Sequence, residues 1–145
     1  MSRKKKVNIF EKDVVFIPLN LRNSHWALLA VYTTTKKIYY YDSMYNESDA
    51  RTLRQNLLTF LVEEAKAIEM TFFKVEDWDI TEHVYCPQQD GSWECGVFTI
   101  MVADFLSDEI PLDIRMGNVY ALSSVNEPFF RAKIATDIKR QRMHY

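Results

Sequence analysis

The stretch Cys86–Phe98 reads CPQQDGSWECGVF and changes character in its middle. Its first half is polar and carries two adjacent glutamines and a glycine, whereas the segment after Cys95 is apolar. Apolar residues then continue at helical spacing through Val97, Ile100, Met101, Phe105 and Leu106. The stretch therefore predicts a loop that enters a mostly buried helix near Cys95.

Three apolar runs that precede this stretch have the composition of β-strands. They are Val14–Leu19, Trp26–Tyr32 and Ile38–Tyr41, and they are rich in β-branched and aromatic residues. The polar link Thr33–Lys37 between the second and third runs is short. These two runs are therefore predicted to pair as a hairpin.

A change of period after the third run predicts a helix. Ser48 or Asp49 can cap its start, and apolar residues recur at every fourth position, at Leu53, Leu57, Leu61 and Ala65. Met70–Val75 is predicted as a fourth strand, and a last helix is predicted after Asn126 with Pro128 in its first turn. This order of strands and helices predicts an α+β fold with a mainly antiparallel sheet packed against helices.

Length and composition favour a single intracellular domain over residues 1–145. The 18 basic and 20 acidic side chains nearly balance, which argues against a general nucleic-acid binder. The apolar runs are shorter than the roughly 18 residues of a membrane span. Two cysteines are too few for a disulfide framework, so we expect a reducing, intracellular setting, the nucleus or the cytoplasm. We also expect a monomer. The basic run Arg3–Lys6 fits a nuclear address, a phosphate contact or a solvated terminus.

Cys95 has the local setting of a nucleophile. A thiol attacks a carbonyl as the thiolate, and the partial positive charge of a helix N-terminus favours the thiolate. Gly96 leaves room beside it for a substrate backbone. The alternative is a small buried hydrophobe, which is the usual role of a free cysteine.

A cysteine nucleophile needs a base, and the chain has three histidines, His25, His83 and His144. His25 opens a predicted strand in NSHWALLAVY, and Asp42 follows the next strand in YYYDSM. In a hairpin, the start of one strand lies beside the end of the next. His25 and Asp42 are therefore predicted to be neighbours at one end of the sheet, where the carboxylate can orient the imidazole. His83 could also serve as the base, and His25 and Asp42 could simply be structural.

Acyl transfer also needs hydrogen-bond donors for the developing oxyanion. The backbone N–H of Cys95 is one candidate, and the side-chain amide of Gln88 or Gln89 is a second. Residue chemistry alone does not choose between the two glutamines. A zinc site made by His83, Cys86 and Cys95 lacks the paired spacing of the usual zinc ligands. We expect no metal and no cofactor.

Three blocks resemble, in order, the signature blocks of the ubiquitin-like-protein-specific cysteine proteases, which include the SUMO (sentrin) proteases. The blocks are HWALLAVY, KKIYYYDSM and CPQQDGSWECGVF, and the match extends over residues 14 to 107. The resemblance implies the papain-like cysteine protease fold in its adenovirus-protease-like form. It also implies hydrolysis of the bond after the C-terminal Gly-Gly of a ubiquitin-like modifier, with SUMO as the first choice, in a precursor or a conjugate.

The resemblance also implies a role for individual residues. It makes His25 the general base, Asp42 its orienting acid and Cys95 the nucleophile. It makes Gln89 the oxyanion-hole amide, and it makes Trp26 the lid of a narrow tunnel that only a Gly-Gly tail can pass. The implied partners are a ubiquitin-like modifier and its conjugates.

The sequence departs from the common form of this family in two places. Gly91 lies one position early, Trp93 fills the gap, and Glu94 stands where an aspartate usually precedes the cysteine. The helical segment that usually precedes His25, with a tryptophan facing Trp26, has no counterpart, so we expect a short or N-terminally truncated catalytic domain. The alternatives are a weakly active or inactive module that binds the modifier, and a protease of this fold that acts on ubiquitin or another target.

Overall fold

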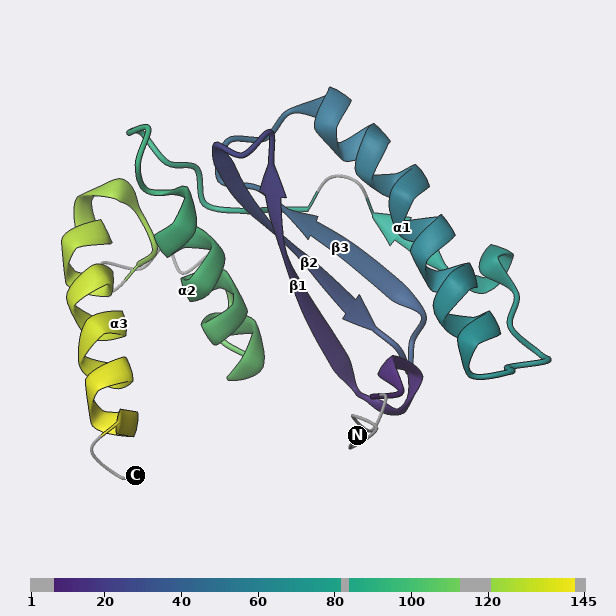
Figure 1. Cartoon of the computed structure of the whole chain (residues 1–145). Coiled ribbons are helices and arrows are strands. Elements are labelled where there is room, and N and C mark those ends of the chain that lie inside the picture. Colours follow the sequence, from purple (N-terminus) through teal and green to yellow (C-terminus); the bar gives the residue numbers. More distant parts are fainter. Residues whose placement is uncertain (1–6, 82–83, 113–120, 143–145) are drawn as a thin grey trace. The chain divides into compact units, whose positions relative to one another are not determined.

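The computed structural model describes residues 7–81, 84–112 and 121–142, so Arg3–Lys6, His83 and His144 lie outside the described residues. Four strands are present: β1 (Val14–Leu21), β2 (His25–Tyr32), β3 (Lys37–Tyr41) and β4 (Asp79–Thr81). Figure 1 shows them with three α-helices, α1 (Glu47–Ala67), α2 (Cys95–Ser107) and α3 (Glu127–Arg142). Short 3₁₀ segments are η1 (Ile9–Glu11), η2 (Val75–Asp77) and η3 (Ser124–Asn126).

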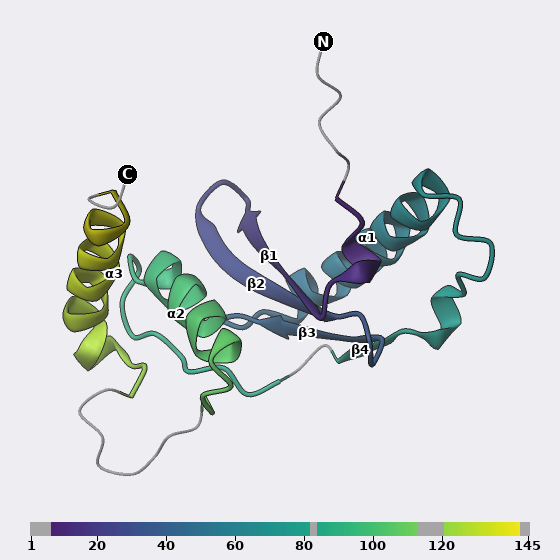
Figure 2. The same cartoon turned by 90° about the horizontal axis from the view of Figure 1, so that it is seen from below.

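The strands form one sheet in the order β1-β2-β3-β4. The links at residues 22–24 and 33–36 are too short for a parallel crossover, so β1, β2 and β3 run antiparallel to one another. β4 returns after α1 and pairs parallel with β3, with Ile80 opposite Ile38. Figure 2 shows the two strands side by side. The α+β fold and the mainly antiparallel sheet predicted from the sequence are therefore confirmed.

The predicted strand at Met70–Val75 is wrong, because the fourth strand is β4. The chain leaves α1 through Glu69, whose φ of 58° starts a turn. The Phe73 ring packs against Phe10 and Trp78, with centroid distances of 5.5 and 6.2 Å. The aromatic residue of this segment thus contributes to a cluster of rings instead of a strand ladder.

The chain forms two compact units, which are described separately. The first comprises residues 1–17, 29–40 and 46–84, and it contains α1 and β4. The helix predicted from the four-residue period is present, and the side chains it buries are Ala50, Leu57, Leu61 and Ala65. Its N-cap is Asn46, two positions before Ser48 and three before Asp49, the two candidates from the sequence. The Asn46 side chain accepts the N–H of Asp49 at 3.2 Å.

The second unit comprises residues 18–28, 41–45 and 85–145, and it contains α2 and α3. α2 begins at Cys95, as predicted, and buries most of its length through Val97, Phe98, Met101, Val102 and Phe105. It packs against α3, where the Phe105 and Phe130 rings meet edge to face at 6.0 Å. α3 begins at Glu127 with Pro128 in its first turn, as predicted. This packing fixes the helix whose first residue is the candidate nucleophile.

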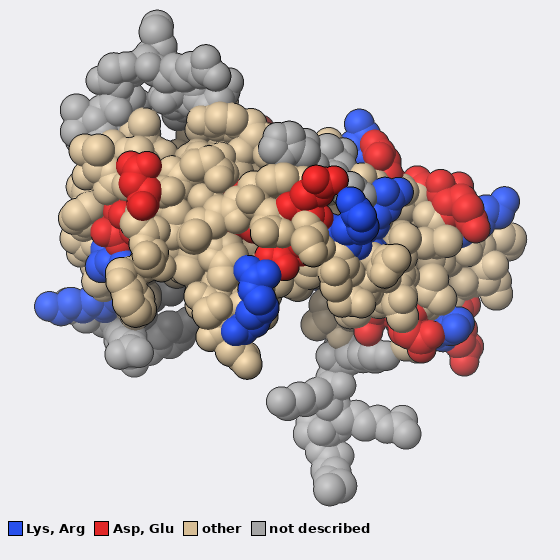
Figure 3. All heavy atoms as spheres, turned by 90° about the horizontal axis from the view of Figure 1, so that it is seen from above, with Lys and Arg blue, Asp and Glu red and all other residues tan. Residues whose placement is uncertain are grey.

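The surface of the described residues carries charges of both signs. On the face drawn in Figure 3, acidic and basic side chains are interspersed. None of the helices in the described part of the chain is both long and apolar enough to cross a membrane.

Candidate active site

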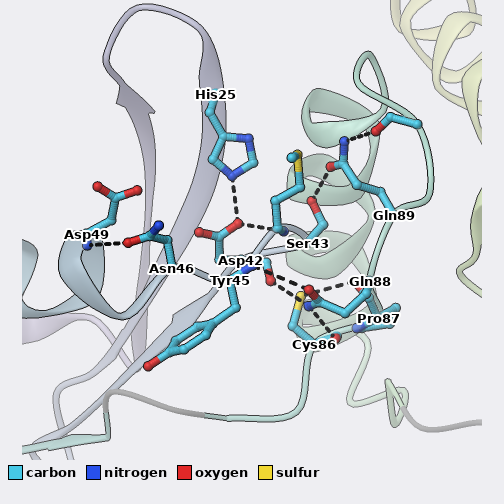
Figure 4. A network of polar contacts seen from close by, with 12 residues as sticks. His25, Asp42, Ser43, Tyr45, Asn46, Asp49, Cys86, Pro87, Gln88 and Gln89 are labelled. Atoms are coloured by element: carbon cyan, nitrogen blue, oxygen red, sulfur yellow. Dashed lines mark hydrogen bonds and ion pairs between the residues drawn. The ribbon is translucent and has the colours of Figure 1, made fainter.

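His25 and Asp42 meet at one end of the sheet, within the second unit. The first residue of β2 is His25, and Asp42 directly follows β3. The His25 Nε2 atom lies 2.6 Å from Asp42 Oδ1, as Figure 4 shows. The side chains are 10% and 0% exposed, respectively. The hairpin thus brings together the two residues that its sequence predicted to be neighbours.

This pair can present a proton acceptor. Asp42 Oδ1 also accepts the N–H of Met44 at 2.8 Å, which fixes the carboxylate. When Nε2–H donates to this carboxylate, the lone pair of the imidazole lies on Nδ1, which is the tautomer that a general base requires. A buried carboxylate beside the ring would also stabilise the imidazolium that forms after proton uptake.

Gln88 binds the backbone and has no amide hydrogen left over. Its Nε2 donates to the carbonyl oxygens of Asp42 at 2.8 Å and Cys86 at 3.0 Å, and its Oε1 accepts the N–H of Tyr45 at 3.3 Å. An amide NH₂ group has two hydrogens, and both are used here. Gln88 therefore ties its loop to the segment after β3.

Gln89 is held differently and keeps donor capacity. Its backbone N–H donates to the Ser43 carbonyl at 2.9 Å, and its Oε1 accepts the Ser43 hydroxyl at 2.5 Å. Its Nε2 donates to the Gly91 carbonyl at 2.5 Å, which uses one of two amide hydrogens (Figure 4). Of the two glutamines, Gln89 is thus the one that can donate to an additional oxygen without losing a bond.

Ser43 belongs to this site, although no sequence pattern indicated it. Ser43 is 3% exposed. Its hydroxyl donates to Oε1 of Gln89, and this bond fixes which end of the amide faces Ser43. The only sequence signal is its place directly after Asp42.

Trp26 lies against the first turn of α2. A Cβ atom built on Gly96 would be 3.8 Å from Trp26 Cδ1, which is van der Waals contact distance, so the indole packs beside the start of the helix. Cys95 is 7% exposed, whereas Trp26 is 41% exposed. The second residue of β2, Trp26, therefore lies beside the second residue of α2, Gly96.

The second cysteine, Cys86, is in a different environment. Burial and then the negative charge of Asp42 raise the pKa of the Cys86 thiol to about 12. Both cysteines are free. At neutral pH Cys86 is therefore a protonated, unreactive thiol.

Among the described residues, His, Cys, Asp and Glu side chains nowhere gather as three potential ligands of a metal ion. Of the three residues considered as zinc ligands, Cys86 and Cys95 lie in the second unit, and His83 lies outside the described residues. Of the three histidines considered as the base, His25 is the one within the described residues.

A family model for the Ulp1 protease family, C-terminal catalytic domain, matches residues 1–143 of the chain. Ubiquitin-like-specific protease 1 of Saccharomyces cerevisiae is 34% identical over 113 residues, which cover 77% of this chain and 17% of that protein. Sentrin-specific protease 2 of Homo sapiens is 28% identical over 143 residues, which cover 96% of this chain and 22% of that protein.

Solved structures are similar as well. The C-terminal Ulp1 protease domain in complex with Smt3, the yeast ortholog of SUMO, has a TM-score of 0.70 at 30% identity and covers 88% of this chain. The SUMO protease Ulp1 with its catalytic cysteine oxidised to a sulfonic acid has a TM-score of 0.69 at 31% identity and covers 93%. The matched parts are 52% and 58% of those solved chains, so this chain spans about half their length. The papain-like fold expected from the sequence is the fold of these relatives.

Proposed function

Because the chain belongs to the Ulp1 protease family, we propose that it acts as a cysteine protease on the bond after the C-terminal Gly-Gly of a ubiquitin-like modifier, SUMO in the first place. The observation that carries the proposal is the buried His25–Asp42 pair, 2.6 Å apart, in the same unit as a helix that begins at Cys95. The matched relatives include a protease whose structure contains Smt3, which supports the choice of SUMO.

The proposed reaction follows the acyl-transfer scheme of cysteine proteases. His25 Nδ1 takes the proton of Cys95, and the thiolate attacks the carbonyl carbon of the last glycine. The backbone N–H of Cys95 and Nε2 of Gln89 donate to the oxyanion. The imidazolium, held by Asp42, gives its proton to the leaving amine, and a thioester forms between the modifier and Cys95. Water, activated by the same imidazole, then hydrolyses the thioester and releases the free thiol.

Trp26 is proposed to select the glycine tail. Its indole lies above the first turn of α2, where Gly96 presents no side chain. A substrate backbone that passes beneath the exposed part of the indole has little room for a Cβ atom, and glycine is the residue without one. This accounts for a preference for Gly-Gly at the position next to the cleaved bond.

The remaining parts of the proposal concern the setting of the reaction. Residues 1–145 are proposed to form one catalytic domain, which acts as a monomer inside the cell, in the nucleus or the cytoplasm. The partners are the modifier and its conjugates, in precursor processing or in deconjugation.

An electrophilic modifier tests the proposal directly. SUMO and ubiquitin, each with a C-terminal propargyl amide, are incubated with the chain, and the mass of the covalent adduct is measured. We expect labelling by SUMO to be faster than labelling by ubiquitin, and Cys95→Ala to abolish both. If neither probe labels the chain while iodoacetamide still alkylates Cys95, the protein is a binding module or a protease for another target.

A further inference from the structure

Glu94, the residue before Cys95, directs its carboxylate away from the helix that it precedes. It occupies the N-cap position of α2 with φ −95° and ψ −15°, and its side chain makes no capping bond. Instead, its Oε2 accepts the N–H of Gly91 at 3.2 Å and the hydroxyl of Ser124 at 2.5 Å. An acidic residue at this position would usually bond to the first N–H groups of its helix. Here the Glu94 carboxylate instead accepts a hydrogen bond from Gly91, in the loop before the helix, and one from Ser124.

Ser124 completes this arrangement from a distant part of the chain. It lies in η3, after the segment that follows α2, and its Oγ accepts the N–H of Asp90 at 2.7 Å. A hydroxyl can donate one hydrogen and accept others, so Ser124 bridges Asp90 and Glu94. The bond to the carboxylate is charge-assisted and stronger than a neutral one. We call these two side chains, with the Asp90 and Gly91 N–H groups they hold, the Glu94–Ser124 clamp.

Gly91 connects the clamp to Gln89. Its N–H donates to Glu94, and its carbonyl accepts Nε2 of Gln89 at 2.5 Å. A Cβ atom on residue 91 would lie 3.2 Å from Oε1 and 3.3 Å from Cδ of Glu94, which is tighter than most Cβ contacts. The absence of a side chain at Gly91 therefore permits the close approach of the Glu94 carboxylate. Because Glu94 holds the N–H of Gly91, it also restrains the carbonyl of the same residue, which orients the Gln89 amide.

On the basis of the proposed function, we propose that Glu94 and Ser124 are positioning residues of the oxyanion hole. They hold the peptide of Gly91, which in turn aims the remaining amide hydrogen of Gln89 at the substrate carbonyl. Neither side chain touches the substrate. Through Ser124, η3 thus takes part in the geometry of catalysis, although it is remote in sequence from the catalytic groups.

A merely structural role would have a different signature from a positioning role. Iodoacetamide alkylates a thiolate by displacement at a saturated carbon, and that reaction develops no oxyanion. Acylation by a modifier does develop one. A weakened clamp should therefore slow acylation and leave alkylation of Cys95 unchanged, whereas a general loosening of the helix start should affect both reactions.

The first arm of the test observes the clamp without catalysis. NMR records the side-chain amide of Gln89 and the exchange of the Asp90 and Gly91 N–H groups in Glu94→Gln and Ser124→Ala. We expect the Gln89 signals to shift in both variants and the Asp90 N–H to exchange faster in Ser124→Ala. Ser123→Ala is the matched control, because the Ser123 hydroxyl bonds only weakly to the Ala121 carbonyl, at 3.5 Å. Unchanged Gln89 and Asp90 signals in both clamp variants would overturn the inference.

The second arm measures turnover of a SUMO fusion. Glu94→Gln is expected to lower kcat by about 10-fold with KM unchanged, since small displacements of a catalytic group are costly. In a Gln89→Ala background the same substitution should add no further loss, because the group that the clamp positions is gone. An equal additional loss in that background would mean that Glu94 acts by another route. If the unaltered chain turns over no modifier, the proposed function fails, and the NMR arm still decides whether the clamp orients Gln89.

Discussion

Gln89 is bonded twice to Ser43: its backbone N–H donates to the Ser43 carbonyl at 2.9 Å, and its side-chain oxygen accepts the Ser43 hydroxyl at 2.5 Å. Two bonds to one residue fix both the backbone position and the side-chain orientation of the glutamine. Gln88, the adjacent residue, uses its whole amide on backbone groups. The two neighbouring glutamines thus have separable roles, one in binding the oxyanion and one in holding the loop.

Substitution of the two glutamines should separate these roles. Gln89→Ala is expected to lower kcat by roughly 10²–10³ with little change in KM, as for an oxyanion donor used in the transition state. Gln88→Ala should instead lower the free energy of unfolding by about 1 kcal/mol, because backbone groups lose their partners. Steady-state kinetics and urea unfolding of both variants measure these effects. A greater loss of kcat in Gln88→Ala than in Gln89→Ala would reverse the assignment.

Asp42 is predicted to act on catalysis through His25. Asp42→Asn keeps an oxygen for the His25 bond but removes the charge that stabilises the imidazolium, so kcat should fall by roughly 10²–10⁴. Because the two residues act as a unit, Asp42→Asn should have little further effect in a His25→Ala background. A double-mutant cycle on kcat tests this. Independent, additive losses would contradict the pairing as the source of the base.

The pairing of His25 with Asp42 was predictable because a short link allows one topology for neighbouring strands, and topology fixes which residues share a sheet end. The start of α2 was predictable for a similar local reason, since the apolar period begins at Cys95. The position of the fourth strand was not, because Phe73 packs with Phe10, a partner far away in sequence. The choice between the two glutamines depends on which amide hydrogens are consumed by distant backbone carbonyls, and no local pattern encodes that.

Cys86 should remain unmodified under conditions in which Cys95 reacts. Its pKa is raised from an ordinary 9.0 to about 12, so the reactive thiolate is scarce at neutral pH. At about pH 7–8, below the ordinary pKa of a free thiol, iodoacetamide is expected to alkylate Cys95 alone in the folded protein. After denaturation it should alkylate both cysteines. Peptide mass spectrometry distinguishes the two sites. Equal labelling of Cys86 and Cys95 in the folded protein would refute the difference.

The raised pKa of Cys86 also predicts a pH dependence of stability. The folded protein keeps this thiol protonated up to about pH 12, whereas the unfolded chain releases the proton from about pH 9. The stabilisation of the folded state by the protonated Cys86 thiol is therefore fully present below about pH 9 and is lost as the pH rises towards 12. Cys86→Ala should flatten this alkaline decline relative to the unaltered chain, as measured by urea unfolding across that range. An unchanged slope would show that Cys86 ionises equally in both states.

Trp26 is predicted to cover the path of the substrate tail while its indole packs against Gly96. A Cβ at residue 96 would meet Trp26 Cδ1 at 3.8 Å, an ordinary van der Waals distance, so Gly96→Ala should fold normally. The tail has no room to pass between these two residues, so the added methyl group should leave the path open. We expect Gly96→Ala to slow labelling by the SUMO probe by less than about 10-fold, with alkylation of Cys95 by iodoacetamide unchanged, whereas a loss of about 10²-fold would mean that the tail lies against Gly96.

Trp26→Ala should slow the same probe, because the indole that covers the path is removed and the tail is no longer held near Cys95. Phe72→Ala is the control, since Phe72 is 92% exposed and lies in the first unit. A SUMO probe ending in Ala-Gly instead of Gly-Gly sharpens the comparison. The intact chain should reject it, whereas Trp26→Ala should discriminate less between the two tails, because the indole that a Cβ would strike is absent. Undiminished selectivity in Trp26→Ala would place the specificity for glycine elsewhere.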